Sequence, residues 1–183
     1  MTSTGSPRFQ IHPQVNSIVM MILRPTSDED LSILISWIKD KNACKLWAGP
    51  QVRFPLSLDG LKKDIEFSEE NTFSMINDDG DFLGLGQLIE KEKGRMHLAR
   101  LIISPNQRGQ GYGNLLCRLL IDKGGDRFGK VNFSLNVYSH NKKAVRLYEK
   151  LGFTQSLDSN ESSEDQTNIH MILKPNNTAV SEE

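Results

Sequence analysis

A glycine-spaced turn follows the mostly apolar residues 98–103 near the middle of the chain. It has the pattern R-x-x-G-x-G with one further glycine, formed by Arg108, Gly109, Gly111 and Gly113. Glycines let the main chain approach a ligand closely, and a helix that begins near Gly113 would direct unpaired N–H groups and its positive end at an anion. The turn is therefore suited to holding a phosphate group.

Two common phosphate-binding loops fit this turn poorly. A nucleotide-triphosphate loop needs G-x-x-x-x-G-K-[ST], and no Lys-Ser or Lys-Thr pair follows these glycines. A dinucleotide loop needs G-x-G-x-x-G, and here the third glycine falls one position early. The turn alone also leaves open a plain strand-to-helix connection.

A second motif lies about 30 residues further on and reads N-x-x-A-x-x-x-Y-x-x-x-G-F. Its members are Asn141, Ala144, Tyr148, Gly152 and Phe153. The first three share one stripe of a helix, and Gly152 is suited to the left-handed conformation that ends a helix, with Phe153 folding back near Tyr148. An ordinary amphipathic helix explains the alanine, the glycine and the phenylalanine. It does not explain the asparagine-to-tyrosine spacing.

Together the two motifs resemble those of the GNAT family of N-acetyltransferases, whose pyrophosphate loop is [QR]-x-x-G-x-[GA]. Residues 23–153 also resemble a group of small bacterial acetyltransferases with the phrases H-L-x-R-[LVI]-I-[IV]-x-P and S-L-N-V, which read HLARLIISP and SLNV here. The resemblance implies an acyltransferase that moves an acetyl group from acetyl-coenzyme A to a primary amine by direct attack on the thioester. It does not identify the acceptor: small amines, amino acids, polyamines, antibiotics and peptide or protein amines all remain open.

The resemblance also implies how coenzyme A is held. Main-chain N–H groups of residues 110–113 would bind the pyrophosphate, and Leu101 and Ile103 would pair with the pantetheine arm and polarise the thioester carbonyl. Asn141 would contact the arm from the other side, and Tyr148 would protonate the leaving thiolate. The expected coenzyme A contacts are Leu101, Ile102, Ile103, Arg108, Gly109, Gln110, Gly111, Tyr112, Gly113, Asn141, Ala144 and Tyr148.

The general base is expected at His97. Counting back along alternate strand positions, Leu101, Ala99 and His97 share one face, and histidine titrates near neutrality. A lone histidine at a strand entrance is more often a hydrogen-bonded edge residue, so Glu90, Glu92 and ordered water stay open as alternatives.

The acceptor pocket is expected to involve Trp47, Phe54 and Glu90. In the GNAT family the first helical region forms a substrate wall, although core or lid packing is the simpler explanation of both aromatic residues. Two other functions also remain open. A sensor would bind acyl-coenzyme A without catalysis, and a dinucleotide-dependent enzyme would bind NAD.

The elements that position these residues are visible as hydrophobic periodicity and turn signals. Strands are expected at 18–23, 72–76, 82–89, 131–137 and 168–173, with hairpin turns at 77–81 and 92–94. Ser27 with Asp30 predicts the start of a first helix, and Leu58 begins a second. The helix after the glycine turn is expected to end near Gly124-Gly125. These elements predict an α/β fold with a mixed, mostly antiparallel sheet of six or seven strands and about four helices.

The chain of 183 residues is expected to form one domain over residues 18–174, with tails at 1–17 and 175–183 and a mobile loop at 155–166. No apolar run approaches the roughly 20 residues of a membrane span, and no signal pattern precedes the domain. A cytoplasmic enzyme that binds neither membrane nor nucleic acid is expected, and a homodimer is left open. Cys44 and Cys117 are expected to be reduced thiols, with no metal site.

The charges are distributed unevenly along the chain. Residues 95–150 hold 11 Lys or Arg against three acids, whereas the whole chain has 22 basic and 23 acidic residues. A positive central region suits a polyphosphate ligand such as coenzyme A.

Overall fold

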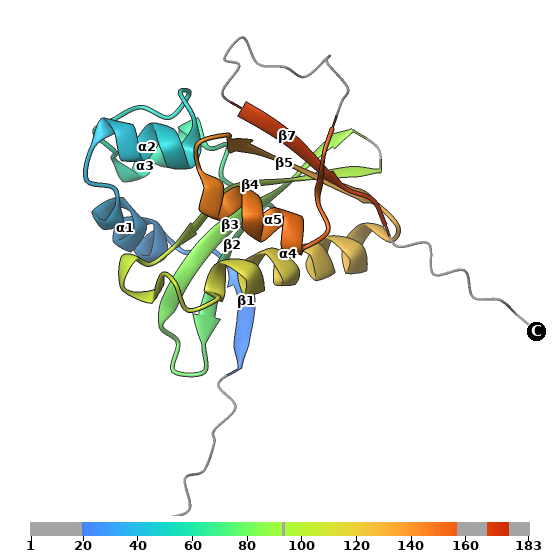
Figure 1. Ribbon diagram of the computed structural model, residues 1–183. Coiled ribbons are helices and arrows are strands. Elements are labelled where there is room, and N and C mark those ends of the chain that lie inside the picture. Colours follow the sequence, from blue (N-terminus) through green and yellow to red (C-terminus); the bar gives the residue numbers. More distant parts are fainter. Residues whose placement is uncertain (1–19, 93, 157–167, 176–183) are drawn as a thin grey trace, which may run out of the picture.

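The computed structural model describes residues 20–92, 94–156 and 168–175 (Figure 1). The expected tail at 1–17, all but the first residue of the expected tail at 175–183, and most of the expected loop at 155–166 lie outside the described residues. Within the described part, no helix combines the length and the apolar character that crossing a membrane requires.

The described strands form one seven-stranded sheet in the order β1-β2-β3-β4-β5-β7-β6. Their bounds are β1 Met21–Pro25, β2 Thr72–Asn77, β3 Phe82–Glu92, β4 Arg95–Ile103, β5 Asn132–Tyr138, β6 Thr154–Gln155 and β7 Asn168–Leu173. Only β4 and β5 pair in parallel, and every other neighbouring pair is antiparallel. The expected mixed sheet and both hairpin turns are confirmed, although β1 begins later than expected and continues to Pro25.

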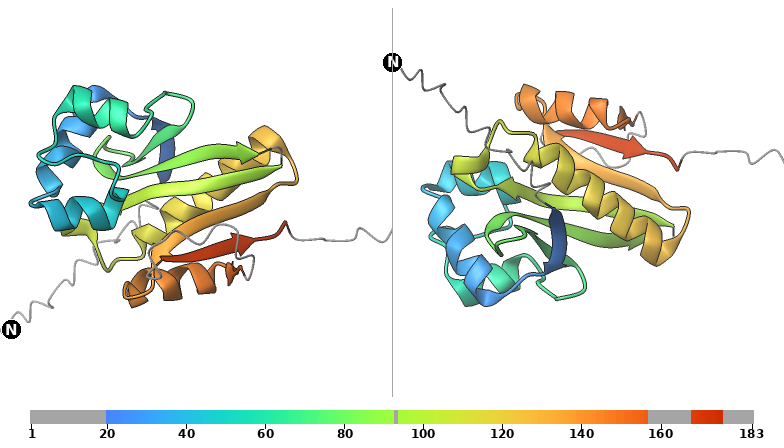
Figure 2. Two further views of the ribbon diagram at one scale, coloured as in Figure 1. Left: turned by 90° about the horizontal axis from the view of Figure 1, so that it is seen from above. Right: turned by 90° about the horizontal axis from the view of Figure 1, so that it is seen from below.

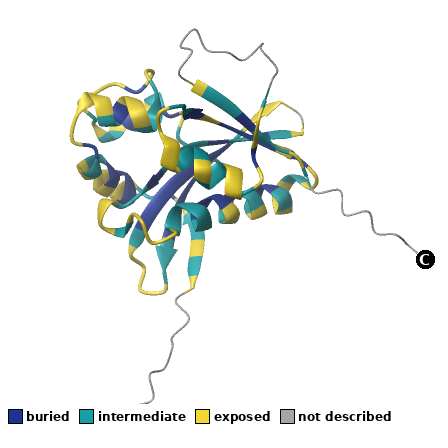
Figure 3. Ribbon diagram, viewed as in Figure 1, coloured by how far each residue is buried: buried dark blue, intermediate teal, exposed yellow. Residues whose placement is uncertain are grey.

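Helices cover both faces of the sheet (Figure 2). Their bounds are α1 Asp28–Trp37, α2 Lys41–Ala48, α3 Leu58–Asp64, α4 Tyr112–Phe128 and α5 Lys142–Lys150, and a short 3-10 turn, η1, spans Pro105–Gln107. The first three helices pack around Leu85 and Ile102 on one face, whereas α4 and α5 share a core with the other face. The strands between these two cores are the most deeply buried part of the chain (Figure 3).

The start of α1 joins three elements through one carboxylate. Asp30 and Ser27 form the expected capping box, and Asp30 also makes two bonds to the Arg24 guanidinium, at 2.6 and 2.9 Å. Ser74 of β2 donates to the same carboxylate at 2.8 Å. Burial opposes ionisation of Asp30, but the bonds from Arg24, the Ser27 amide and Ser74 outweigh it and hold the pKa of this carboxyl below its usual range. A buried charge therefore ties β1, α1 and β2 together.

The structure contains one helix more than expected, and another is longer than expected. Asp40 caps the additional helix α2 by accepting from the Ala43 amide at 2.8 Å. Helix α4 continues through Gly124 to Phe128 and does not end at the glycine pair. A Cβ atom at Gly124 would lie 2.7 Å from the Phe133 ring, so this glycine allows the helix to pack closely against the sheet.

The sheet opens between its two parallel strands. Residues 95–98 of β4 pair with residues 132–135 of β5, but beyond Leu98 the two strands have no common register. The remaining residues of β5 pair only with β7. Figure 2 shows β4 and β5 diverging from this point. The opening leaves one edge of β4 without a strand partner, directly before the glycine-spaced turn.

Candidate active site

A bulge in β4 changes which side chains face the two cores. Residues Gln87 and Leu85 of β3 lie opposite Ala99 and Ile102, so β4 has one extra residue in this interval. Before the bulge, Met96 and Leu98 face the core beneath α4; after it, Leu101 and Ile103 do so. His97 lies on the opposite face. The expectation that His97 and Leu101 share a face is therefore wrong, because the extra residue shifts the alternation.

The glycine-spaced turn has the geometry of an anion site. Gly109 and Gly111 have φ of +82° and +88°, and a Cβ atom at either would have nothing within 4 Å. Gly111 caps α4, which begins at Tyr112, one residue earlier than expected. The main-chain N–H groups of residues 110–113 donate to no group in the described part of the chain. Four donors and the positive end of a 17-residue helix thus meet at one open turn.

Side chains of the turn bond to its flanks and leave those four amides available. The Arg108 Nε donates to the Ile103 carbonyl at 3.1 Å, which ties the turn to the end of β4. The Gln110 amide donates to the Asn106 carbonyl at 3.3 Å and to Gln107 Oε1 at 3.1 Å. Both side chains are exposed, so the remaining donors of Arg108 stay available to a negatively charged ligand.

Helix α5 places the asparagine and tyrosine of the second motif beside α4. Asn141 caps the helix by accepting from the Ala144 amide at 3.3 Å, so its oxygen is engaged and its amide nitrogen is available. Gly152 ends the helix with φ of +92°. The Phe153 amide donates to the Tyr148 carbonyl at 3.0 Å, and the two rings meet edge to face with centroids 6.1 Å apart. The expected helix end and the return of Phe153 are confirmed.

The Tyr148 hydroxyl is held in its protonated form. Burial raises the pKa of Tyr148, and the nearby Cys117 adds to the shift. Its hydroxyl makes no hydrogen bond to the described part of the chain, which leaves it available to a ligand. A Cβ atom at Gly113 would lie 3.1 Å from Leu147 of α5, so the start of α4 lies close to the middle of α5. The turn and Tyr148 are thus on the same side of the sheet.

His97 lies at the closed base of the opening, one residue before β4 and β5 separate. Its Nδ1 is 3.0 Å from the hydroxyl oxygen of Ser134, which is fully buried in β5. The contact fixes the imidazole ring on the face of the sheet opposite α4. His97 therefore approaches the opening from the side away from Tyr148.

The residues expected around the acceptor do not all lie together. Trp47 reaches the bulge, where its indole N–H donates to the Arg100 carbonyl at 2.8 Å. Phe54 is 37% exposed and is not part of the core beneath α1, α2 and α3. Glu90 is exposed and pairs with Met96 at the closed end of β4, so the structure does not bring it to the opening.

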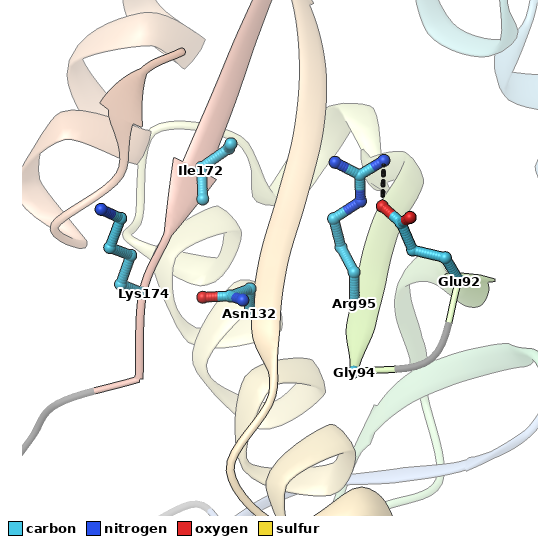
Figure 4. A pocket seen from close by; sticks show the side chains of 6 residues that line it. All are labelled: Glu92, Gly94, Arg95, Asn132, Ile172 and Lys174. Carbon is cyan, nitrogen blue, oxygen red and sulfur yellow. Dashed lines mark ion pairs between the residues drawn. The ribbon is translucent and has the colours of Figure 1, made fainter. Parts of the chain in front are cut away.

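Two cavities of the described chain lie away from the opening. A cavity of about 240 Å³ at the closed end of the sheet is bordered by the ion pair of Glu92 with Arg95, whose atoms are 2.7 Å apart (Figure 4). This ion pair engages Glu92, the other alternative base, far from the bulge. A cavity of about 860 Å³ lies between the C-terminal ends of α4 and α5, beside Leu151 and Lys174. Neither cavity contacts the turn or the bulge.

Comparison with known proteins decides the family. A model described as the acetyltransferase (GNAT) family matches residues 34–153. The chain belongs to this family. It is 30% identical over 134 residues to a spermidine N(1)-acetyltransferase of Escherichia coli K12, which covers 72% of both chains.

Solved structures of other proteins share the fold of this GNAT acetyltransferase. One is a spermidine N-acetyltransferase from Vibrio cholerae in complex with CoA and spermine, with a TM-score of 0.67 and 22% identity over 85% of this chain and 95% of the other. A GNAT-family acetyltransferase from Bacillus anthracis has a TM-score of 0.66 and 10% identity, and covers 84% of this chain and 94% of its own.

The family uses acetyl-coenzyme A as its acetyl donor, and the residues of this acetyltransferase fit that group. A diphosphate needs several N–H donors at an open main-chain surface, and the four amides of residues 110–113 supply them. The unpartnered edge of β4 beyond Leu98 is suited to an extended, amide-containing arm.

Three residues that shape the opening between β4 and β5 of this GNAT protein were not predicted from the sequence. Arg100 forms the bulge, Gln87 of β3 accepts a bond from its guanidinium, and Ser134 holds His97. Gly86, opposite the bulge, was the only local signal: a Cβ atom there would lie 2.6 Å from Leu120. This close approach, like that of the Ile102 carbonyl to Gly84, does not indicate where the extra residue of β4 lies.

Proposed function

We propose that the chain transfers the acetyl group of acetyl-coenzyme A to a primary amine, by direct attack of the amine on the thioester. One observation carries the proposal. Four main-chain donors without a partner in the described chain follow directly on an unpartnered strand edge, and the protonated phenol of Tyr148 lies on the same side of the sheet as these donors. The spermidine N-acetyltransferases among its relatives support an amine as the acceptor.

Binding and orientation come from the main chain. The amides of residues 110–113 hold the diphosphate, and Arg108 adds positive charge beside it. The edge of β4 at Leu101 and Ile103 pairs with the arm, and a strand amide near the bulge polarises the thioester carbonyl. The last of these interactions strengthens as charge develops on the carbonyl oxygen, so it lowers the barrier of the chemical step.

Proton transfers are assigned to two side chains on opposite sides of the opening. An amine is mostly protonated at neutral pH and must lose a proton before it can attack. His97, oriented by Ser134, accepts that proton directly or through water. After the attack the nitrogen carries one proton more than the amide product; as the C–S bond breaks it releases that proton to solvent, while Tyr148 donates its own proton to the departing thiolate and regains one from solvent. Burial raises the pKa of Tyr148, so the phenol is protonated whenever the amine arrives.

Release of free thiol tests this function. Purified protein is mixed with acetyl-coenzyme A and each member of an amine panel that includes spermidine and spermine, and the thiol is followed with time. We expect acceptor-dependent release of thiol for at least one amine, together with a rise in the mass of that amine by one acetyl group. Tight binding of acetyl-coenzyme A with no thiol released by any amine would indicate a sensor and refute the transferase.

A further inference from the structure

Arg100 has an unusual main-chain conformation at the opening. Its φ is +53°, and among the described non-glycine residues only Glu66 shares a positive φ. A non-glycine residue is strained in this region, so such a conformation persists only where the surroundings hold it. The Trp47 indole does so by donating to the Arg100 carbonyl at 2.8 Å. The bulge turns the Arg100 side chain toward β3 and α3, on the face opposite α4.

The Arg100 guanidinium rests on a neutral amide. Its Nη1 donates to Gln87 Oε1 at 2.5 Å. Gln87 is fully buried, and its own nitrogen donates to the Ile65 carbonyl and to the Thr72 hydroxyl, which fixes the oxygen toward Arg100. The guanidinium is thus held in place by a group that does not neutralise its charge.

The same guanidinium keeps donors without protein partners. Its Nε is buried and has no hydrogen-bond partner among the residues that the structure describes. It forms no ion pair with a described carboxylate, although Glu66 attracts it from a distance. Burial lowers the pKa of Arg100 and outweighs that attraction, but a guanidinium stays charged at neutral pH. A charged, partly desolvated fork with unused donors favours an oxyanion as its partner.

The acceptor is the ligand that can reach this group. The turn and Tyr148 take the donor from the α4 side of the sheet, which leaves the face of His97 and Arg100 to the attacking amine. Arg100 is three residues beyond His97, about 10 Å along the strand, and lies where β4 leaves β5. An acceptor whose amine lies at the opening places its neighbouring atoms beside the guanidinium.

We propose that Arg100 binds a carboxylate of the acceptor, so that the enzyme acetylates amines that carry a carboxylate a few bonds away. This inference rests on the proposed function and narrows its substrate class. Free amino acids and short peptides share the required chemistry. A polyamine does not, because its further ammonium groups would meet a guanidinium of the same sign in a partly desolvated site. The expected acceptor class therefore differs from the spermidine named for the relatives.

Matched acceptors provide the test. Rates are measured with a set of amino acids, with the corresponding amino acid amides, with short peptides, and with spermidine. The amides keep the reacting amine and lose the carboxylate. The variants are Arg100→Asn, because asparagine tolerates positive φ, and Arg100→Lys, which keeps the charge but loses the fork. Arg95→Gln is the control, since it removes an arginine from the closed end of the same strand.

We expect the acids to be better acceptors than their amides. Arg100→Asn should raise KM for an acid by roughly 10-fold or more, the loss that follows when one hydrogen bond to a charged group is removed. The KM of Arg100→Asn for the matching amide should not change. The KM of Arg100→Lys for the acid should lie between those of the unaltered protein and Arg100→Asn. Arg95→Gln should leave the KM for the acid and the KM for the amide unchanged. Melting temperature and acetyl-coenzyme A affinity, measured for every variant, separate this effect from misfolding.

Three outcomes would overturn the inference in distinguishable ways. Amides or spermidine that react as well as the acids would refute carboxylate recognition and leave the transferase intact. An equal fall in kcat for acids and amides in Arg100→Asn would show that Arg100 only supports the bulge. No thiol from any acceptor, in protein that binds acetyl-coenzyme A, would refute the transferase itself and this inference with it.

Discussion

Gly111 offers a sharp test of the diphosphate site, because the chain contains a matched control. Gly111 and Gly80 have φ of +88° and +84°, and a Cβ atom at either would have nothing within 4 Å. Alanine should therefore cost each position a similar strain, about 1–2 kcal/mol, with no clash in either case. Gly80 lies in the hairpin turn between β2 and β3, whereas Gly111 lies among the four unpaired amides.

The two substitutions should differ in their effect on acetyl-coenzyme A. A methyl group at Gly111 occupies the space that the diphosphate needs and removes at least one hydrogen bond to a charged group. Such a bond contributes roughly 1.5–3 kcal/mol, so the dissociation constant should rise roughly 10- to 100-fold. Gly80→Ala should lower the melting temperature about as much as Gly111→Ala does, but it should leave the affinity for acetyl-coenzyme A unchanged.

Titration calorimetry with acetyl-coenzyme A and thermal unfolding measure both quantities on the same samples. Equal affinities for Gly111→Ala, Gly80→Ala and the unaltered protein would refute the assignment of the diphosphate to this turn. A loss of affinity shared by both variants would point to general destabilisation, and would likewise count against the local explanation.

Three further predictions follow from the side chains of the opening and of the fold. Tyr148→Phe should lower kcat roughly 100-fold or more with unchanged acetyl-coenzyme A affinity; unchanged turnover on a working acceptor would remove its role as the acid. His97→Ala should abolish the limb along which kcat/KM rises with pH, and a variant that keeps this limb would exclude His97 as the base. The folded-state pKa of Asp30 lies below its unfolded-state value, which is near 3.9. The ionised carboxylate therefore stabilises the fold fully above that pH, and this stabilisation is lost as the pH falls through the folded-state pKa. Asp30→Asn should lower the free energy of unfolding by roughly 2–3 kcal/mol at pH 7, as measured by urea unfolding. This loss is smaller than for a fully buried ion pair because Arg24 is half-buried, and it should shrink below pH 4.

The parts of the fold that the sequence predicted correctly are those set by neighbouring residues. The capping box of Ser27 and Asp30, the turn before Phe82 and the helix end at Gly152 all depend on a few consecutive side chains and their main-chain bonds. The glycine-spaced turn belongs to the same class, because its open amides follow directly from glycines that take positive φ.

The features that the sequence did not reveal depend on contacts between distant residues. Helix α4 passes through Gly124 because the Phe133 ring fills the space beside it. The bulge at Arg100 is held by Trp47 and Gln87, which are 53 and 13 residues away. One inserted residue in β4 was enough to reverse the face assigned to His97 relative to Leu101. Periodicity cannot detect such an insertion, because the apolar residues on its two sides each keep a regular alternation.

In the proposed enzyme, everything depends on the main-chain donors of residues 110–113 binding the diphosphate of acetyl-coenzyme A. Backbone amide signals recorded by NMR during a titration with this donor test it most directly. We expect the signals of residues 110–113 to move first and furthest, whereas the signal of the hairpin glycine Gly80 stays in place. Amides of residues 110–113 that remain unmoved at saturating donor, while another surface responds, would contradict it.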